Sequence, residues 1–167
     1  MVLCTHGTSA DNLQSILEYG LLVDKPKVWC VSNDAIYCWS KRYVDIEYGE
    51  NEDEEYVEEI LIQTALNNCY CTLATAKDCR AVVVLFNVNE DELEEDLSCD
   101  NMNIASCIHR NIKPEEIVKV LISQDLSIIR GLFISMMTNK RLYNNQFTEF
   151  EEKLVSYLII LVLLKMI

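Results

Sequence analysis

The spacing of hydrophobic and polar residues changes twice at the start of the chain. An apolar run, Met1–Cys4, leads into the polar stretch Thr5–Thr8, and Ser9–Tyr19 then has apolar residues at helical spacing. A second apolar run follows at Val28–Val31. Because strands repeat every two residues and helices every three to four, this order predicts a strand, a turn, a helix and a second strand.

The boundaries of the first helix follow from its flanking residues. Ser9 or Asp11 can cap the helix with a side-chain oxygen, and Gly20 can end it by adopting a positive φ. After the second strand, apolar residues three and four apart predict another helix over Ala35–Tyr48.

The middle of the chain contains its most acidic and its most apolar segments. Gly49–Glu59 is a charge run that we expect to begin as a loop and to continue as a helix as far as Asn67. Cys69–Ala76 fits either a helix end or a strand. Arg80–Val88 is nearly all β-branched or apolar, which predicts a central strand covered on both faces.

The next part of the chain alternates between polar connections and short apolar runs. Asn89–Asp96 is acidic and predicts a turn or a short helix, and Asn101–Asn111 predicts a strand. Ile112–Ile117 contains Pro114 and predicts a turn, after which Val118–Ser123 predicts another strand.

The last 43 residues, 125–167, read as an extension of a domain that spans residues 1–124. Phe147–Ile167 has the pattern of an apolar helix, interrupted by Lys153 and Lys165. A membrane-spanning helix needs about 20 apolar residues, so we expect no membrane insertion. We expect this helix to pack on the same domain, on a partner or on a second copy in a homodimer.

Charge restricts the classes of partner. The chain has 167 residues, half of them hydrophobic, and 27 acids against 14 bases for a formal net charge of −13. This size and composition predict a folded domain with a substantial core. The negative charge disfavours nucleic acid, whose binding depends on Lys and Arg.

Eight cysteines are scattered along the chain and lack the paired spacing of a zinc site. The beginning of the chain also lacks the basic and apolar regions of a secretion signal. We therefore expect unpaired thiols, no metal and a cytoplasmic location.

The segment Leu3–Trp39 resembles the opening of the ADP-ribosyltransferase fold. The resemblance lies in a strand with His6-Gly7-Thr8, a helix with Ile16-Leu17 and the pair Gly20-Leu21. The order of the later elements is also similar to that fold, up to Ser123. The resemblance implies an α/β or α+β domain with a split, mixed sheet, flanking helices and His6 facing a cleft at the end of the first strand.

The resemblance further implies that NAD is the cofactor. His6 would hold a ribose hydroxyl, the backbone of Gly7 would bind the nicotinamide amide, and an aromatic ring would stack on nicotinamide. That ring is Trp29, or Tyr37 in a shifted alignment. The cofactor-binding residues that the resemblance implies in this chain are His6, Gly7, Thr8, Trp29, Ser32 and Tyr37.

Many members of this fold place a catalytic Glu just before the Ile-Pro turn, and this chain departs from that pattern. The matching position falls at Ala105 or Ser106, neither of which is acidic. Asp100 is the nearest acid upstream, and with His6 it completes the catalytic residues that the resemblance implies.

Two hypotheses from different classes follow. The first is an NAD-dependent mono-ADP-ribosyltransferase that modifies a protein, as a phage or bacterial effector would. The second is a member of the same fold that has lost turnover and acts as an acidic inhibitor of a host defence protein. A relationship to RNA 2′-phosphotransferases is disfavoured by the charge and by the absence of their second His and Arg.

Overall fold

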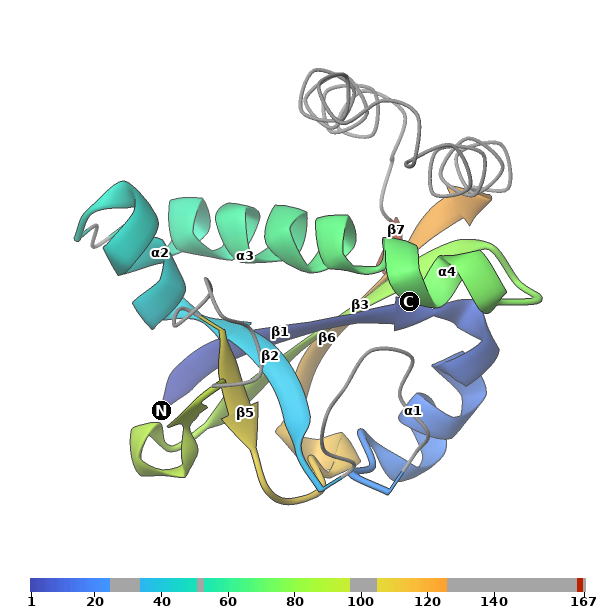
Figure 1. The fold of residues 1–167 in the computed structure, drawn as a ribbon, viewed down its shortest axis with the longest axis horizontal. Coiled ribbons are helices and arrows are strands. Elements are labelled where there is room, and N and C mark those ends of the chain that lie inside the picture. The colour runs from blue at the N-terminus through green and yellow to red at the C-terminus, as the bar shows by residue number, and fades with distance from the viewer. Residues whose placement is uncertain (25–33, 51–52, 97–104, 126–164, 167) are drawn as a thin grey trace, which may run out of the picture.

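The computed structural model describes residues 1–24, 34–50, 53–96, 105–125 and 165–166 (Figure 1). Within these ranges, helices pack against a seven-stranded sheet in an α+β arrangement. The strands are β1 (Val2–Ser9), β2 (Ile36–Ser40), β3 (Arg80–Val88), β4 (Glu94–Glu95), β5 (Ser106–Ile108), β6 (Ile117–Asp125) and β7 (Lys165–Met166). The α-helices are α1 (Leu13–Tyr19), α2 (Lys41–Tyr48), α3 (Glu54–Asn68) and α4 (Tyr70–Thr75), and the 3-10 turns are η1 (Ala10–Asn12), η2 (Glu90–Glu92) and η3 (Pro114–Glu116).

The strands follow the order β4-β5-β2-β1-β3-β6-β7. Every strand pair in the described ranges is antiparallel. For the described strands the prediction of a mixed sheet is therefore wrong, and of the two fold classes considered the α+β class is confirmed. In Figure 1, β1, β3 and β6 cross the molecule together, while β2 turns away from β1 towards β5.

The first strand is longer than the sequence predicts. Residues 5–8 were expected to form a turn, but β1 stays paired with β3 from Val2↔Val88 to Ser9↔Ala81. The polar side chain of Thr5 is tolerated because its Oγ1 donates to the Leu61 carbonyl of α3, 3.1 Å away. His6 and Gly7 therefore lie inside a central strand rather than at its end.

The first helix begins as η1 and continues as α1. The prediction of a side-chain cap from Ser9 or Asp11 is wrong, since no side chain caps either segment. Asp11 instead accepts hydrogen bonds from the backbone of Lys77 and Asp78, at 2.8 and 2.9 Å. The predicted end is confirmed, because Gly20 follows α1 with a φ of 78°.

The helix predicted over Ala35–Tyr48 begins only at Lys41, and its first part is the strand β2. Burial alternates along β2, so that Ile36, Cys38 and Ser40 are buried. The segment pairs with β1 on one side and with β5 on the other. These two partners, distant in the sequence, override a local pattern that also fits a helix. The predicted strand at Val28–Val31 lies outside the described residues.

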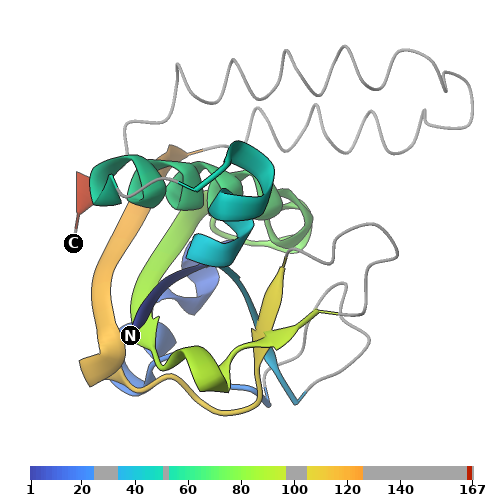
Figure 2. The same cartoon turned by 90° about the vertical axis from the view of Figure 1, so that its left-hand side faces the viewer.

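The core lies on both faces of β3. Val82, Val84 and Phe86 face a cluster that includes Ile16 of α1. Val83 and Leu85 face the opposite way, towards Ala65 of α3. Figures 1 and 2 accordingly show α3 on one side of the sheet and α1 on the other. This arrangement confirms the prediction of a strand covered on both faces.

The remaining predictions in the middle of the chain hold with small changes. α3 covers the predicted helix, and its cap is Asp53, whose Oδ1 accepts from the amides of Glu55 and Tyr56. The ambiguous segment Cys69–Ala76 contains α4. The strand expected at Asn101–Asn111 is limited in the described residues to β5, while the Pro114 turn and the strand after it are confirmed as η3 and β6.

The end of the chain returns to the sheet. Lys165 and Met166 form β7, which pairs with Ile122 and Leu121 of β6. The prediction of a helix over Phe147–Ile167 is therefore wrong for these two residues, and the rest of that segment lies outside the described residues. No helix in the described ranges is long and apolar enough to cross a membrane.

Cysteine thiols occupy both sides of the sheet. The buried thiols in the described part of the chain are those of Cys4, Cys38, Cys69, Cys79 and Cys107. Burial raises the pKa of Cys69 to about 12, so this thiol stays protonated and unreactive at neutral pH. That all eight cysteines are unpaired stays a prediction, since Cys30, Cys99 and the side chain of Cys71 lie outside the described part of the structure.

Candidate functional site

The sheet opens between β1 and β2. The two strands pair through Cys4↔Ser40 and Thr5↔Trp39. Beyond Thr5, β2 no longer pairs with β1 in the described part of the chain, although β1 stays paired with β3 as far as Ser9. The residue that follows Thr5 therefore stands at the point where the sheet divides.

His6 is that residue, and its side chain reaches towards β2. Its Nδ1 lies 2.8 Å from the carbonyl oxygen of Tyr37. Because a carbonyl can only accept, Nδ1 carries a proton, and Nε2 is the acceptor nitrogen when the ring is neutral. The contact holds the ring in one tautomer and one orientation.

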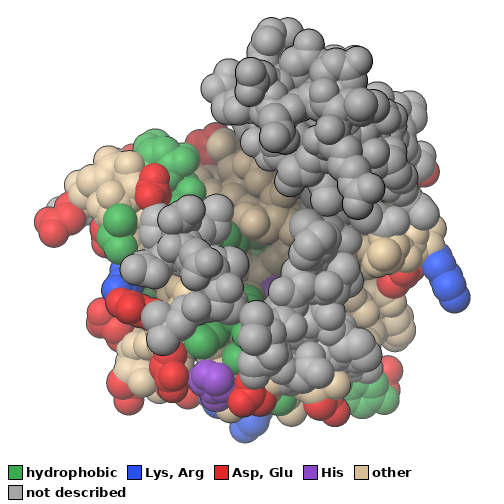
Figure 3. Space-filling view, viewed as in Figure 1, with side chains coloured by type: hydrophobic (Ala, Val, Ile, Leu, Met, Phe, Trp, Pro, Cys, Tyr) green, Lys and Arg blue, Asp and Glu red, His purple; other side chains and the backbone are tan. Residues whose placement is uncertain are grey.

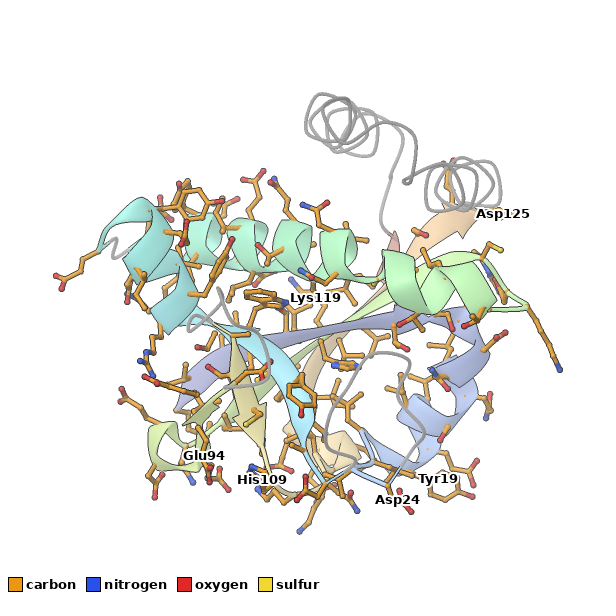
Figure 4. The ribbon with its side chains drawn as sticks, viewed as in Figure 1. Tyr19, Asp24, Glu94, His109, Lys119 and Asp125 are labelled. Carbon is orange, nitrogen blue, oxygen red and sulfur yellow. The ribbon has the colours of Figure 1, made fainter. Side chains whose placement is uncertain are left out.

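His6 is only partly buried within β1. The chain has one other histidine, His109, which Figure 4 places near the lower edge of the molecule. His109 directly follows β5, so the two histidines lie at different strands of the sheet.

Tyr37 is the other predicted site residue that the structure brings to this opening. It lies on β2, in register with Cys107 of β5, and is partly buried. Its backbone carbonyl is the part that contacts His6. Three further predicted site residues, Trp29, Ser32 and Asp100, lie outside the described residues.

Gly7 follows His6 and has a packing role of its own. A Cβ at this position would stand 2.2 Å from the carbonyl oxygen of Ala65 and 2.7 Å from Sγ of Cys69. Real Cβ atoms essentially never approach other atoms that closely. The glycine therefore allows α3 to lie directly against β1, independently of any ligand.

Thr8 and the residues after it fix the end of β1. The buried Thr8 Oγ1 accepts a hydrogen bond of 2.9 Å from Nδ2 of Asn12. Asp11 binds the two amides that precede β3, and these hydrogen bonds lower the pKa of its carboxyl group. The far end of the strand that carries His6 is thus held by local hydrogen bonds.

A buried carboxyl group lies opposite the position where the resemblance implies an acid. The amide of Asp96 donates to the carbonyl of Ala105 at 3.0 Å, next to Ser106, whose Oγ lies 3.4 Å from Ser40 Oγ. Asp96 is 6% exposed and is the buried acid among the described residues. Sequence reasoning missed it, because nothing in the acidic run Asn89–Asp96 distinguishes its last residue from the others.

Arg110 has a structural rather than a phosphate-binding environment. Its guanidinium group donates to Glu92 of η2 at 2.6 and 2.9 Å and to Glu116 of η3 at 3.0 and 2.8 Å. The preceding residue, His109, faces the surface, where its Nε2 lies 3.6 Å from Glu94 Oε2.

Arg110 is paired with both Glu92 and Glu116, and this group of three residues is here called the clamp. We expect the clamp to make the free energy of unfolding depend on pH in the acidic range. Hydrogen bonds from Arg110 lower the pKa of Glu92 to about 2 and also lower the pKa of Glu116. A lowered folded-state pKa contributes stability above the unfolded pKa of about 4.3, and the contribution disappears as pH falls towards 2. We expect Arg110→Met to lower the urea midpoint at pH 7 and to flatten its decline between about pH 5 and 2.

Arg42→Met is the matched control, because Arg42 pairs with Glu95 at an exposed site on the same half of the sheet. In Arg42→Met, the urea midpoint should decline between about pH 5 and 2 as it does in the wild-type protein. If the urea midpoint of Arg110→Met declined with pH as steeply as that of the wild type, the clamp would not contribute to the pH dependence of stability.

Comparisons with known proteins assign no function to the site. No protein-family model matches the chain, and neither the curated proteins nor the solved structures contain a match. Among the described residues, no group of three or more His, Cys, Asp or Glu side chains is arranged to hold a metal ion.

Proposed function

We propose that the chain is an NAD-dependent mono-ADP-ribosyltransferase with the ADP-ribosyltransferase fold, acting on a protein. The observation that carries this proposal is the oriented, partly exposed His6 at the point where β1 and β2 separate, in contact with Tyr37. The contact with the Tyr37 carbonyl fixes the orientation of the imidazole ring, as recognition of a ribose hydroxyl requires.

The order of elements supports the proposal. The end of the pairing between β1 and β2 after Thr5 supports the split sheet that the resemblance implies. In the second half, the strand β3, the acidic segment with η2 and β4, the strand β5, the Pro114 turn and the strand β6 follow one another as in that fold. A chance likeness of the short His-Gly-Thr motif would not predict these later elements.

The proposed reaction transfers ADP-ribose from NAD to a nucleophile on a protein. The bond between the ribose carbon and nicotinamide breaks, and nicotinamide leaves with the electron pair. The nucleophile donates its own pair to that carbon and loses a proton. Positive charge builds up on the ribose in between, so a nearby carboxylate accelerates the step by electrostatic stabilisation. His6, Gly7 and Thr8 of β1, with Tyr37 of β2, are the described residues that would hold the dinucleotide.

Two acids are candidates for that carboxylate. Asp100 is the acid that the resemblance implies. Asp96 is the candidate that the fold adds, since it is buried and lies across the ladder from Ala105. Burial favours Asp96, because a carboxylate acts more strongly on a developing charge when little water surrounds it.

A protein acceptor fits the charge of the chain better than a nucleic acid does. At a net charge of −13, the surface repels phosphates and attracts cationic proteins. The alternative proposal is a binding protein of the same fold without turnover, which inhibits a host defence protein through its acidic surface. The observation in favour of this alternative is the absence of an acid at Ala105 and Ser106.

NAD is expected to raise the melting temperature of the wild-type protein. A ligand that binds the folded state alone adds about 2.7 kcal/mol at a hundredfold excess over Kd. For a domain of this size that is roughly 5–10 °C. His6→Ala should abolish the increase by removing the ribose contact. Differential scanning fluorimetry with and without NAD measures both variants.

His109→Ala is the control for this experiment, because His109 is the second histidine of the chain and faces the surface. It should keep the full response to NAD. Urea unfolding of His6→Ala without NAD shows whether its fold is intact. A wild-type protein that NAD does not stabilise, or a folded His6→Ala that responds normally, would contradict the proposed site.

Asp96→Asn and Asp100→Asn distinguish the two acids. Both should keep the response to NAD, and the one that removes the catalytic carboxylate should reduce transfer of labelled ADP-ribose by about 100-fold or more. Wild-type protein that binds NAD without transferring label to candidate proteins would favour the binding-protein alternative.

A further inference from the structure

The outer side of α2 carries an exposed apolar surface. Ile46 and Tyr48 are 54% and 53% exposed. Tyr48 packs edge-on against Tyr43 at 6.2 Å between ring centroids, and Tyr43 packs in the same way against Trp39 at 4.7 Å. Trp39 in turn packs against the core beneath α3. The apolar surface is therefore anchored to the core by a row of rings and costs little entropy to immobilise on binding.

Acidic residues adjoin this surface in the sequence, at the end of α2 and the start of α3. The cations nearest in the fold are already paired, Lys41 with Asp45, Arg42 with Glu95 and Lys119 with Glu58. Within the described ranges, no ion pair involves the four acids that flank the end of α2 and the start of α3, which are Glu47, Glu50, Glu54 and Glu55. In Figure 3, green and red side chains accordingly stand together at the upper left, over these two helices.

The sequence contains a second copy of the same local pattern for comparison. Leu17-Glu18-Tyr19 on α1 matches Ile46-Glu47-Tyr48 on α2, and Leu17 and Tyr19 are similarly exposed, at 46% and 56%. On α2, Tyr48 packs against the ring of Tyr43, whereas Tyr19 on α1 makes no ring contact within the described ranges. Only the α2 copy combines the apolar pair with a row of rings and several unpaired acids.

We propose that Tyr43, Ile46, Glu47, Tyr48 and Glu50, here called the α2 face, bind a cationic, partly apolar segment of another protein. Lys or Arg side chains of the segment lie against Glu47 and Glu50, and an apolar side chain covers Ile46 and Tyr48. The charge selects this occupant, because a second copy of the chain at −13, a nucleic acid and an anionic membrane are all repelled. This inference does not depend on the proposed NAD site.

A labelled peptide of alternating leucine and lysine is the probe, and an oligolysine of equal charge is the charge-only comparison. Fluorescence anisotropy at about 0.15 M salt, where long-range attraction is screened, measures both affinities. We expect the leucine-lysine peptide to bind the wild-type protein more tightly. Ile46→Ser with Tyr48→Ser should weaken that binding about tenfold, because two exposed apolar contacts are lost.

Leu17→Ser with Tyr19→Ser is the matched control and should change the affinity less than about twofold. Glu47→Gln with Glu50→Gln should weaken binding and reduce its salt dependence, without touching the cap of α3. Equal weakening by both serine pairs, or equal binding of the two peptides, would overturn the proposal. A wild-type dimer that the Ile46 and Tyr48 pair of substitutions dissociates would also overturn it, since the occupant would then be a second copy.

Discussion

Gly20→Ala is expected to be the most damaging single change in the chain, with a loss of about 4 kcal/mol or more in the free energy of unfolding. Gly20 has φ 78° and ψ −158°, a region that costs other residues about 1–3 kcal/mol. In addition, a Cβ here would lie 1.9 Å from the carbonyl oxygen of Ile112. That oxygen accepts a hydrogen bond of 2.9 Å from the Leu21 amide. The Leu21 carbonyl in turn accepts a hydrogen bond of 2.9 Å from the Ile112 amide.

The clash at Gly20 cannot be relieved cheaply. Leu21 and Ile112 are both buried in the cluster that includes Ile16. Moving Ile112 away would break two hydrogen bonds, worth about 1 kcal/mol each, and would open the core between α1 and η3. At about 2–4 °C per kcal/mol, a folded variant would melt at least about 8 °C lower than the wild type.

Gly49→Ala separates the clash from the backbone strain. Gly49 has φ 85° and ψ 159°, in the same region, but a Cβ there meets no atom of the described residues within 4 Å. We therefore expect Gly49→Ala to lose about 1–3 kcal/mol from strain alone. Urea unfolding of the two variants measures the difference, and equal losses would mean that contact with Ile112 adds nothing.

Gly7→Ala should be the second most damaging change, at about 3 kcal/mol or more. The new methyl group would overlap the backbone oxygen of Ala65, which belongs to α3 and cannot rotate away. α3 would have to move from β1, which would loosen its contacts with Val83 and Leu85. Urea unfolding measures the loss.

A second substitution tests the mechanism at Gly7. Cys69→Ala removes the sulfur that a Cβ at position 7 would meet at 2.7 Å but leaves the Ala65 oxygen in place. Gly7→Ala combined with Cys69→Ala should therefore recover only part of the stability lost by Gly7→Ala. Full recovery would assign the clash to the sulfur, and a stable Gly7→Ala would contradict the close approach of α3 to β1.

This packing role affects how the proposed NAD site can be tested. The resemblance assigns Gly7 to the nicotinamide amide through its backbone, yet a side chain at Gly7 would first displace α3. Loss of NAD binding in Gly7→Ala would thus report a damaged fold. His6 is the better position for the test, because its side chain contacts a backbone carbonyl at the opening of the sheet.

Segments whose local pattern is compatible with only one type of secondary structure were predicted correctly from the sequence. Arg80–Val88 is apolar on both faces, and β3 occupies those residues because the core covers it on both sides. The helix after the charge run and the stop at Gly20 were also correct. In each case the property that decides the structure, such as apolar character or a positive φ, is carried by the residues of the segment.

Tertiary structure alone decided the features that concern the candidate site. β1 continues through His6, Gly7 and Thr8 because β3 supplies a partner for each residue, and Ile36–Ser40 is a strand because β1 and β5 flank it. The burial of Asp96 and the crowding of Gly7 by α3 likewise depend on residues far away in the sequence. A local pattern carries no information about such partners, so the sequence by itself determined which segments form the core, while the pairing of strands decided where His6 points.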